Sequence, residues 1–142
     1  MEKVLYVDDE PEVRQIAQEI LTKEGYEVIL AKDGQEALEL AMSQGPDLII
    51  LDYFMPPGLN GDEVCRQLKK QEETKSIPII MVTAHPSEKE KSLGAGAIDF
   101  ITKPVEKLDL LVRIRSALKI RHINNELQKI IAYIAELEKK IE

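Results

Sequence analysis

The chain passes repeatedly from a short apolar run into a helical pattern, and this alternation restricts the folds open to it. The runs at 4–7, 48–51 and 79–82 contain no charged or strongly polar residue. As strands they would be buried on both faces. Stretches with apolar residues at helical spacing follow them. Buried strands separated by helices indicate a parallel sheet between two helix layers.

Five such strand–helix units can be traced. Because crossovers between parallel strands are almost always right-handed, we predict a doubly wound α/β fold with a five-stranded parallel sheet. The sequence does not fix the strand order. In the last helix, Leu108, Leu111 and Leu118 are predicted to face the sheet. The predicted strands are 4–7, 27–31, 48–51, 79–82 and 97–101, and the predicted helices are 12–23, 34–44, 61–73, 87–93 and 105–142.

Composition excludes several classes of function. A chain of 142 residues suffices for one domain and a short extension. The net charge of -7 and the absence of Trp argue against direct nucleic-acid binding. The single Cys65 excludes an internal disulfide and a cysteine-rich metal site. No apolar run reaches the roughly 18 residues of a membrane span, and the first residues show no export signal. We therefore expect no membrane association and a cytoplasmic location.

Charged and polar side chains stand where the apolar runs end. Asp8 and Asp9 follow the first, Asp52 the third, Thr83 the fourth and Lys103 the fifth. Open parallel sheets bind ligands beyond the carboxyl ends of their strands, so these residues should meet at one edge. Any one of them could simply end a strand. Five together favour cation binding or chemistry.

The residue types at this edge indicate magnesium and phosphoryl transfer. Three neighbouring carboxylates repel one another, and a hard divalent cation relieves that repulsion. A carboxylate beside Mg²⁺ can attack phosphorus and form an aspartyl phosphate. A nearby ammonium group would stabilise charge on the transferring group. This reasoning leaves open which carboxylate is the nucleophile.

Four segments resemble the signature segments of response-regulator receiver domains, the CheY-like superfamily of two-component signalling. The resemblance extends in order over residues 1–120, and four segments in series are specific where one would be weak. It implies the flavodoxin-like receiver fold. The segments are Val4–Pro11, Leu48–Gly61, Pro78–Ala84 and Gly94–Pro104.

The resemblance also assigns roles at the metal and phosphoryl positions. Asp52 is expected to accept a phosphoryl group from a histidine kinase or phosphotransfer protein. Asp9 is expected to bind Mg²⁺ directly and Asp8 through water. The backbone carbonyl of Phe54 is expected to supply a further ligand.

Other residues are expected to respond to the phosphate. Thr83 and Lys103 would contact it. Phe100 stands at the family's switch position, where an aromatic ring turns inward when Thr83 is drawn to the phosphate; the alternative is a plain core residue. Phe54 and His85 stand where the family tunes phosphate loss, and the bulk of Phe54 predicts slow self-dephosphorylation.

The sequence departs from the family pattern in two places. The segment 55–61 carries one residue more than the common pattern, with Pro57 or Gly58 as the extra one. The stretch from Thr83 to Lys103 is slightly short, and the loss should fall in the fourth helix. This second departure argues against a dimer built on that helix.

Beyond residue 119 the helical pattern becomes a heptad seam. Such a seam needs a partner, and self-association as a parallel coiled-coil homodimer is the simplest one. The alternative is a helix that folds back on its own domain. We therefore divide the chain into a receiver domain at 1–119 and a coiled-coil extension at 120–142, which could lead into an output domain. The seam consists of Ile120, Ile123, Leu127, Ile130, Ile134, Leu137 and Ile141.

The predicted function is a phosphorylation switch, not an enzyme acting on other substrates. One alternative is a Mg²⁺-dependent phosphohydrolase with an aspartyl-phosphate intermediate. Such enzymes commonly carry a second Asp two residues after the nucleophile, where this chain has Phe54. Another alternative is a degenerate receiver that serves only as a dimerisation scaffold.

Overall fold

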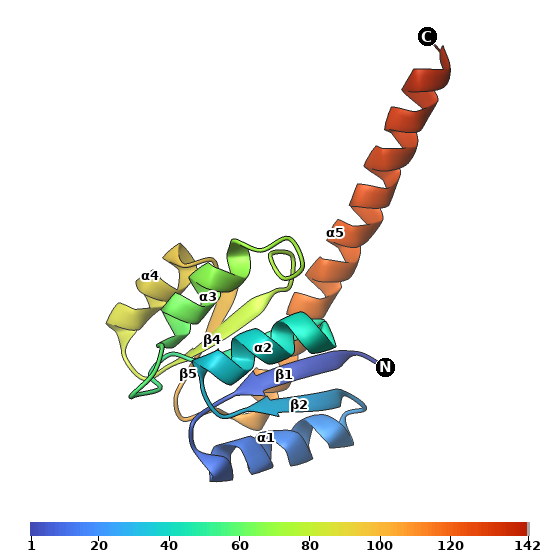
Figure 1. Cartoon of the computed structure of the whole chain (residues 1–142). Helices are drawn as coiled ribbons and strands as arrows, with labels where there is room; N and C mark the ends of the chain where they lie inside the picture. Colours follow the sequence, from blue (N-terminus) through green and yellow to red (C-terminus); the bar gives the residue numbers. More distant parts are fainter. Residues whose placement is uncertain (142) are drawn as a thin grey trace.

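The computed structural model describes residues 1–141 and shows a parallel sheet between two layers of helices, with one helix projecting from it (Figure 1). Strands and helices alternate along the whole chain, as the sequence predicted. The strands are β1 (Lys3–Val7), β2 (Glu27–Ala31), β3 (Leu48–Asp52), β4 (Ile79–Thr83) and β5 (Asp99–Thr102). The helices are α1 (Pro11–Lys23), α2 (Gly34–Gln44), α3 (Gly61–Lys69), α4 (Pro86–Gly94) and α5 (Lys107–Ile141).

The sheet has the order β2-β1-β3-β4-β5, and every pair is parallel. All five residues of β3 and of β4 are buried, which agrees with the four consecutive apolar residues that open each strand. The chain order reverses between β1 and β3, so the carboxyl ends of these two strands border a crevice. The predicted doubly wound fold is confirmed.

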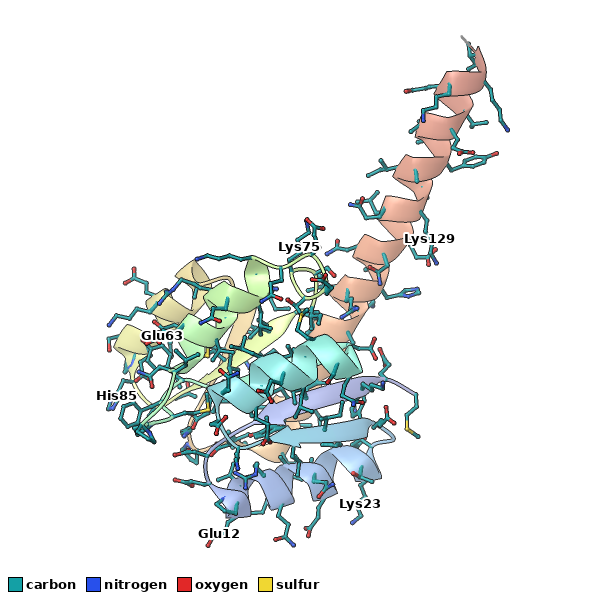
Figure 2. The ribbon with its side chains drawn as sticks, in the orientation of Figure 1. Glu12, Lys23, Glu63, Lys75, His85 and Lys129 are labelled. Atoms are coloured by element: carbon teal, nitrogen blue, oxygen red, sulfur yellow. The ribbon has the colours of Figure 1, made fainter. Side chains whose placement is uncertain are left out.

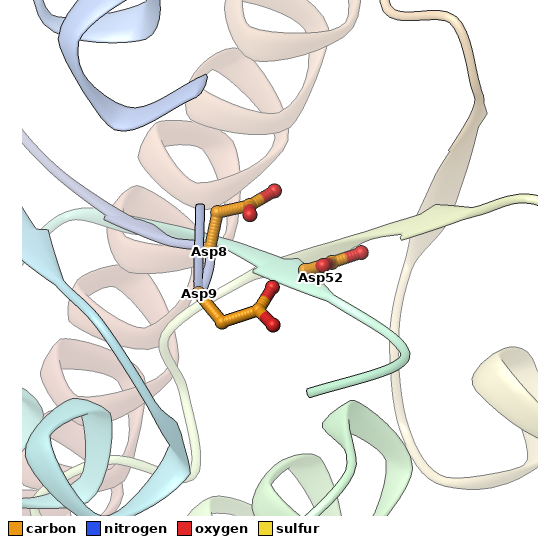
Figure 3. A group of neighbouring side chains, drawn as sticks. All are labelled: Asp8, Asp9 and Asp52. Carbon is orange, nitrogen blue, oxygen red and sulfur yellow. The ribbon is translucent and has the colours of Figure 1, made fainter. Parts of the chain in front are cut away.

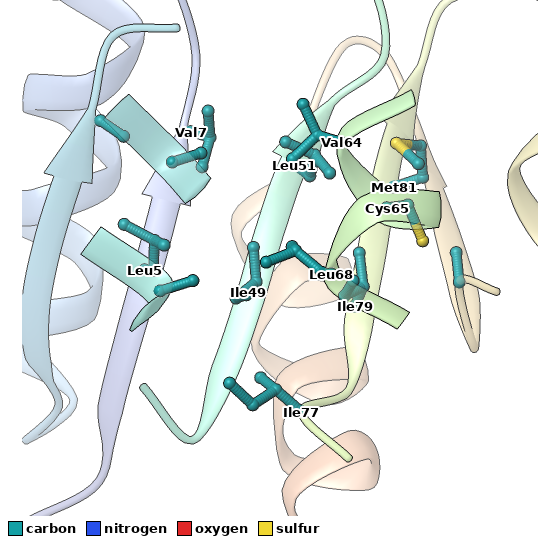
Figure 4. Packing of buried hydrophobic residues seen from close by; sticks show 14 of the residues in the cluster. Leu5, Val7, Ile49, Leu51, Val64, Cys65, Leu68, Ile77, Ile79 and Met81 are labelled. Atoms are coloured by element: carbon teal, nitrogen blue, oxygen red, sulfur yellow. The ribbon is translucent and has the colours of Figure 1, made fainter. Parts of the chain in front are cut away.

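Two apolar cores stabilise the sheet, one on each face. On one face, Leu5, Ile49 and Ile79 pack beneath α2 and α3 (Figure 4). On the other, Tyr6 and Ile50 pack against α1 and α5. Alternate residues of the same strands thus enter opposite cores, because side chains alternate across a strand.

Helix α5 is 35 residues long and extends far beyond the sheet, where Lys129 and its neighbours project into solvent (Figure 2). Its sheet-facing stripe differs from the prediction at one position. Leu111 and Leu118 are buried as expected, but Leu108 is 72% exposed. The first turn of α5 presents Leu110 to the core instead. Within residues 1–141, no helix is both long and apolar enough to cross a membrane.

Helix α3 ends at Lys69, four residues before the predicted end at Glu73. The cause is the completely buried Thr74, whose hydroxyl donates a hydrogen bond to the carbonyl of Leu68 at 2.7 Å. The Lys69 ammonium also donates to the carbonyls of Lys75 and Ile77. These bonds satisfy carbonyls of the helix end and of the following turn. The remaining predicted boundaries within residues 1–141 lie within two residues of the observed ones, and the predicted end of the last helix at 142 lies outside the described residues.

Replacing Thr74 with valine tests this account of the α3 terminus. Thr74→Val keeps the volume but leaves the buried Leu68 carbonyl without its side-chain donor, so we expect a loss of about 1–3 kcal/mol in the free energy of unfolding. Urea denaturation measures it. Thr22→Val, at an exposed position of α1, is the matched control. Equal stability of the two variants would contradict the account.

Candidate functional site

Three aspartates meet at the carboxyl ends of neighbouring strands (Figure 3). Asp8 and Asp9 follow β1, and Asp52 is the last residue of β3. Each offers a carboxylate oxygen, and these oxygens all lie within 4.8 Å of one another. The sequence predicted this convergence. An all-oxygen donor set of this kind fits a hard divalent cation such as Mg²⁺.

The electrostatics of this cluster are unfavourable when no cation is bound. Asp8 and Asp52 are almost completely buried, whereas Asp9 is exposed. Burial, followed by repulsion from Asp8, raises the pKa of Asp52 to about 7. Burial also raises the pKa of Asp8. The edge therefore favours any group that brings positive charge to it.

Lys103 supplies one such charge from the segment after β5. Its ammonium lies 3.0 Å from Oδ1 of Asp52. Burial lowers the pKa of Lys103, but the hydrogen bond to Asp52 and the attraction between the two charges raise it overall. The backbone N–H of Lys103 donates to the carbonyl of Thr83 at 2.8 Å. This bond connects the ends of β4 and β5 next to the acidic cluster.

Thr83 has hydrogen-bonding capacity that the protein does not use. Thr83 is fully buried at the end of β4. Among the buried side-chain oxygens and nitrogens of residues 1–141, its hydroxyl oxygen Oγ1 lacks a hydrogen-bond partner. A buried hydroxyl without a partner is costly. Such a group in a ligand-binding edge is expected where a ligand satisfies it.

The other predicted site residues surround the cluster without joining it. Phe54 is 61% exposed in the loop after β3. His85 is exposed and precedes the first residue of α4, at the end of the molecule remote from the projecting helix (Figure 2). Phe100 lies half-buried on β5, with the Lys89 ammonium 4.8 Å and the Arg113 guanidinium 5.9 Å from its ring centre. Cations at these distances attract an aromatic ring.

Backbone contacts shape the loop that follows Asp52. The amide oxygen of Asn60 accepts a hydrogen bond from the backbone of Met55 at 3.2 Å. At Gly61, a Cβ atom would lie 2.5 Å from the carbonyl oxygen of Asp52, so only glycine lets α3 begin this close to β3. The departure noted at 55–61 lies in this loop, where the Pro56–Pro57 peptide bond is cis.

Sequence reasoning missed several residues that hold the site in place. Arg14 donates to the carbonyl of Asp8 at 2.7 Å, and the backbone N–H of Glu10 donates to the Asp8 carboxylate at 2.9 Å. The position of Arg14 in the first turns of α1, the helix that begins soon after the Asp pair, could have suggested the first contact. No sequence signal pointed to Lys89 and Arg113 beside Phe100.

The parallel sheet, its strand order and the three aspartates at its edge define an α/β domain with an acidic, ligand-binding type of edge. Residues 4–115 match the family described as the response regulator receiver domain. The chain belongs to this family.

Solved structures agree with that assignment. The chain is similar to the chemotaxis protein CheY4 of Vibrio cholerae, with 35% identity and a TM-score of 0.77 over 82% of this chain and 98% of that one. It is also similar to the receiver domain of a sensor histidine kinase from Pseudomonas aeruginosa, with 30% identity and a TM-score of 0.77 over 83% and 98% of the two chains. That receiver holds a magnesium ion in its active-site cleft.

A third similar structure reaches further along this chain. NtrX from Brucella abortus is 29% identical, with a TM-score of 0.84 over 92% of this chain. That share is larger than residues 1–119 can supply, so the match includes part of the projecting helix. The matched region is 30% of NtrX, which is a longer protein.

The burial of Asp52 and its repulsion from Asp8 predict a stability that depends on pH. A folded-state pKa of about 7, against an ordinary 3.8, means that ionising Asp52 costs stability, which falls as the pH rises from about 4 through 7. With a chelator present, we expect Asp52→Asn to gain roughly 1–4 kcal/mol at pH 8 and much less at pH 5.

Denaturant unfolding at the two pH values measures this difference. Glu63→Gln, at an exposed position of α3, is the control for loss of a surface carboxylate. A gain for Asp52→Asn that is the same at both pH values would show that repulsion at the site does not limit stability.

Proposed function

We propose that this chain is a receiver whose Asp52 accepts a phosphoryl group from a histidine kinase or a phosphotransfer protein. The arrangement around Asp52 carries the proposal. Its carboxylate is buried beside Asp8 and Asp9, contacts the Lys103 ammonium, and lies one strand away from the unpartnered hydroxyl of Thr83. These are the groups that a bound phosphoryl group requires: a nucleophile, positive charge and a hydrogen-bond donor.

In this proposal a carboxylate oxygen of Asp52 attacks the phosphorus atom. The new bond is an acyl phosphate, and the bond between phosphorus and the donor breaks with its electron pair going to the donor. Asp9, Asp52 and the carbonyl of Phe54 would hold Mg²⁺ directly and Asp8 would hold it through water, which would supply positive charge to neutralise the negative charge on the phosphoryl oxygens. That charge is what otherwise prevents two anions from approaching each other.

The residues around the cluster would then contact the new phosphate and respond to it. Lys103, which pairs with Asp52 in this structure, would pair with a phosphoryl oxygen. Thr83 would donate its hydroxyl hydrogen to another. Because Thr83 is fully buried, a shift toward the phosphate would alter packing at the end of β4 and favour inward movement of Phe100 on β5. A bias of a few kcal/mol between the two packings would suffice.

The alternative functions receive less support from the structure. A phosphohydrolase would need a proton donor next to the aspartyl phosphate, and the corresponding position carries the exposed ring of Phe54. A scaffold without phosphorylation would gain nothing from an acidic cluster whose mutual repulsion destabilises the fold. Signalling through reversible phosphorylation of Asp52 explains both features.

The proposal includes a parallel homodimer formed by α5. From Ile120 to Leu137, the seam residues are between 40% and 55% exposed, on a helix that projects away from the receiver. Helix α5 does not fold back on the domain. An apolar stripe of this length needs a partner, and an identical stripe on a second copy matches it heptad by heptad. Phosphorylation would then act by changing the geometry of the pair.

Phosphorylation with a small-molecule donor tests the proposal. We expect intact-mass analysis after incubation with acetyl phosphate and Mg²⁺ to show one added phosphoryl group. The adduct should be absent with Asp52→Asn or with a chelator, and unchanged with the surface control Glu63→Gln. An adduct that persists in Asp52→Asn would place the acceptor elsewhere. No adduct from acetyl phosphate or from any tested kinase would favour the scaffold function.

The lifetime of the phosphate tests the role of Phe54. Its large side chain lies in the loop directly after Asp52, so it should limit the access of water to the phosphate. We expect Phe54→Ala to lose the phosphoryl group several-fold faster than the unaltered chain, and Phe54→Tyr, which keeps the ring, to match it. Decay measured by intact mass after removal of the donor gives the rates. If Phe54→Ala lost the phosphoryl group no faster than Phe54→Tyr and the unaltered chain, the shielding role would be refuted.

A further inference from the structure

Helix α5 has two faces with different tasks, and they share no residue. One face packs on the sheet along the receiver part of the helix. At its end, Arg121 donates to the carbonyls of Pro46 at 3.3 Å and Asp47 at 2.9 Å. This anchor fixes the first turn of the extension to the loop before β3. The packing residues are Leu110, Leu111, Ile114, Ala117 and Leu118.

The seam continues onto the receiver in the same heptad register. If Ile120 is an a position and Ile123 a d position, then Ser116 is the preceding d position and Arg113 the preceding a position. The packing residues and Arg121 occupy positions b, e and f instead. Ser116 is exposed on the receiver part of α5, and its small side chain permits close approach of another helix. The face of α5 that carries the seam is therefore exposed to solvent at Ser116, before the extension begins.

We propose that a second copy of this chain binds in parallel along the seam from Ser116 to Ile141, so that the interface includes the receiver's own part of α5. This inference rests on the proposed homodimer and deepens it. The two receivers would then lie on the outer sides of one helix pair, held at a fixed distance. The two receivers would therefore not move freely relative to each other.

Charge favours the parallel arrangement over the antiparallel one. The antiparallel alignment that best matches the apolar layers sets Ile120 against Leu137 and Ile123 against Ile134 of the other copy. It also brings Lys119 beside Lys140 at flanking positions, twice in each dimer. Like charges placed directly opposite each other destabilise such pairs.

The parallel arrangement avoids this repulsion. There, each g position faces the e position of the next heptad in the other copy. Glu126 then faces Ile131, and Tyr133 faces Glu138, so no like charges meet. Ile131 and Tyr133 also add apolar area beside the seam, where they are 50% and 65% exposed in the single chain.

The proposed interface stops below Ser116 for a structural reason. The next seam position is Arg113, whose guanidinium pairs with Asp99 at 2.6 Å and with Asp109 at 2.8 Å. A charged side chain held by two carboxylates does not form an apolar layer. The same guanidinium lies over Phe100, so the interface ends beside the residue proposed to respond to phosphorylation.

Cysteine cross-linking of the full chain tests the inference. In a parallel pair, identical d positions face each other, close to the separation that a disulfide needs. Ser116→Cys is the test and Ile123→Cys the positive control within the extension. Gln128→Cys, one heptad after Arg121 on the receiver-facing side of the helix, is the negative control. The native Cys65 is buried, and its thiol donates a hydrogen bond to the carbonyl of Ala95. The unaltered chain is the control for any cross-linking through this cysteine.

We expect Ser116→Cys to form a disulfide-linked dimer at a rate similar to Ile123→Cys and about tenfold faster than Gln128→Cys. Cross-linking at Ile123 but not at Ser116 would overturn the extended interface while leaving the homodimer in place. Cross-linking only in a mixture of Ser116→Cys with Ile141→Cys would show an antiparallel pair and overturn the inference. A monomeric mass by sedimentation, with no cross-link at any site, would reject the proposed homodimer itself.

Discussion

The burial of the Asp8 and Asp52 carboxylates beside each other is the constraint on which the rest of the site depends. Asp8 follows the buried apolar part of β1 and Asp52 ends β3, so the sheet that stabilises the domain also brings them together in a buried place. The Lys103 ammonium lies against the Asp52 carboxylate and offsets part of this negative charge. The fold therefore holds an unfavourable concentration of negative charge, which a bound divalent cation would relieve.

Most of this arrangement could be predicted from the sequence. Uninterrupted apolar runs in the sequence indicate a parallel sheet. A parallel sheet brings residues from distant parts of the chain to one edge. Asp8, Asp52, Thr83 and Lys103 were found in this way, because strand ends are visible in a sequence. The strand order could not be predicted, because it depends on which crossover passes over which face of the sheet. The right-handed rule permits more than one such order.

The features that escaped prediction depend on side-chain contacts between segments. The end of α3 is set by the Thr74 hydroxyl, which lies beyond the helix and bonds back to it; helical periodicity alone cannot reveal such a bond. Leu108 fits the apolar spacing of α5 but lies in its first turn, where Leu110 fills the core instead. The cations beside Phe100 come from two different helices, and only the packed structure brings them to one ring.

Helix α5 connects the receiver, with its proposed phosphorylation site, to the proposed coiled-coil seam, and the two faces of the helix explain this connection. Residues at b, e and f tie α5 to the sheet, and Arg121 extends that attachment to the loop before β3, the strand that ends at Asp52. Residues at a and d remain available to a partner. Arg113 belongs to the seam register yet turns its charge to Asp99 beside Phe100, and it is the point where the two faces meet. A change in the packing of Phe100 would therefore reach the end of the proposed seam through the Arg113 guanidinium.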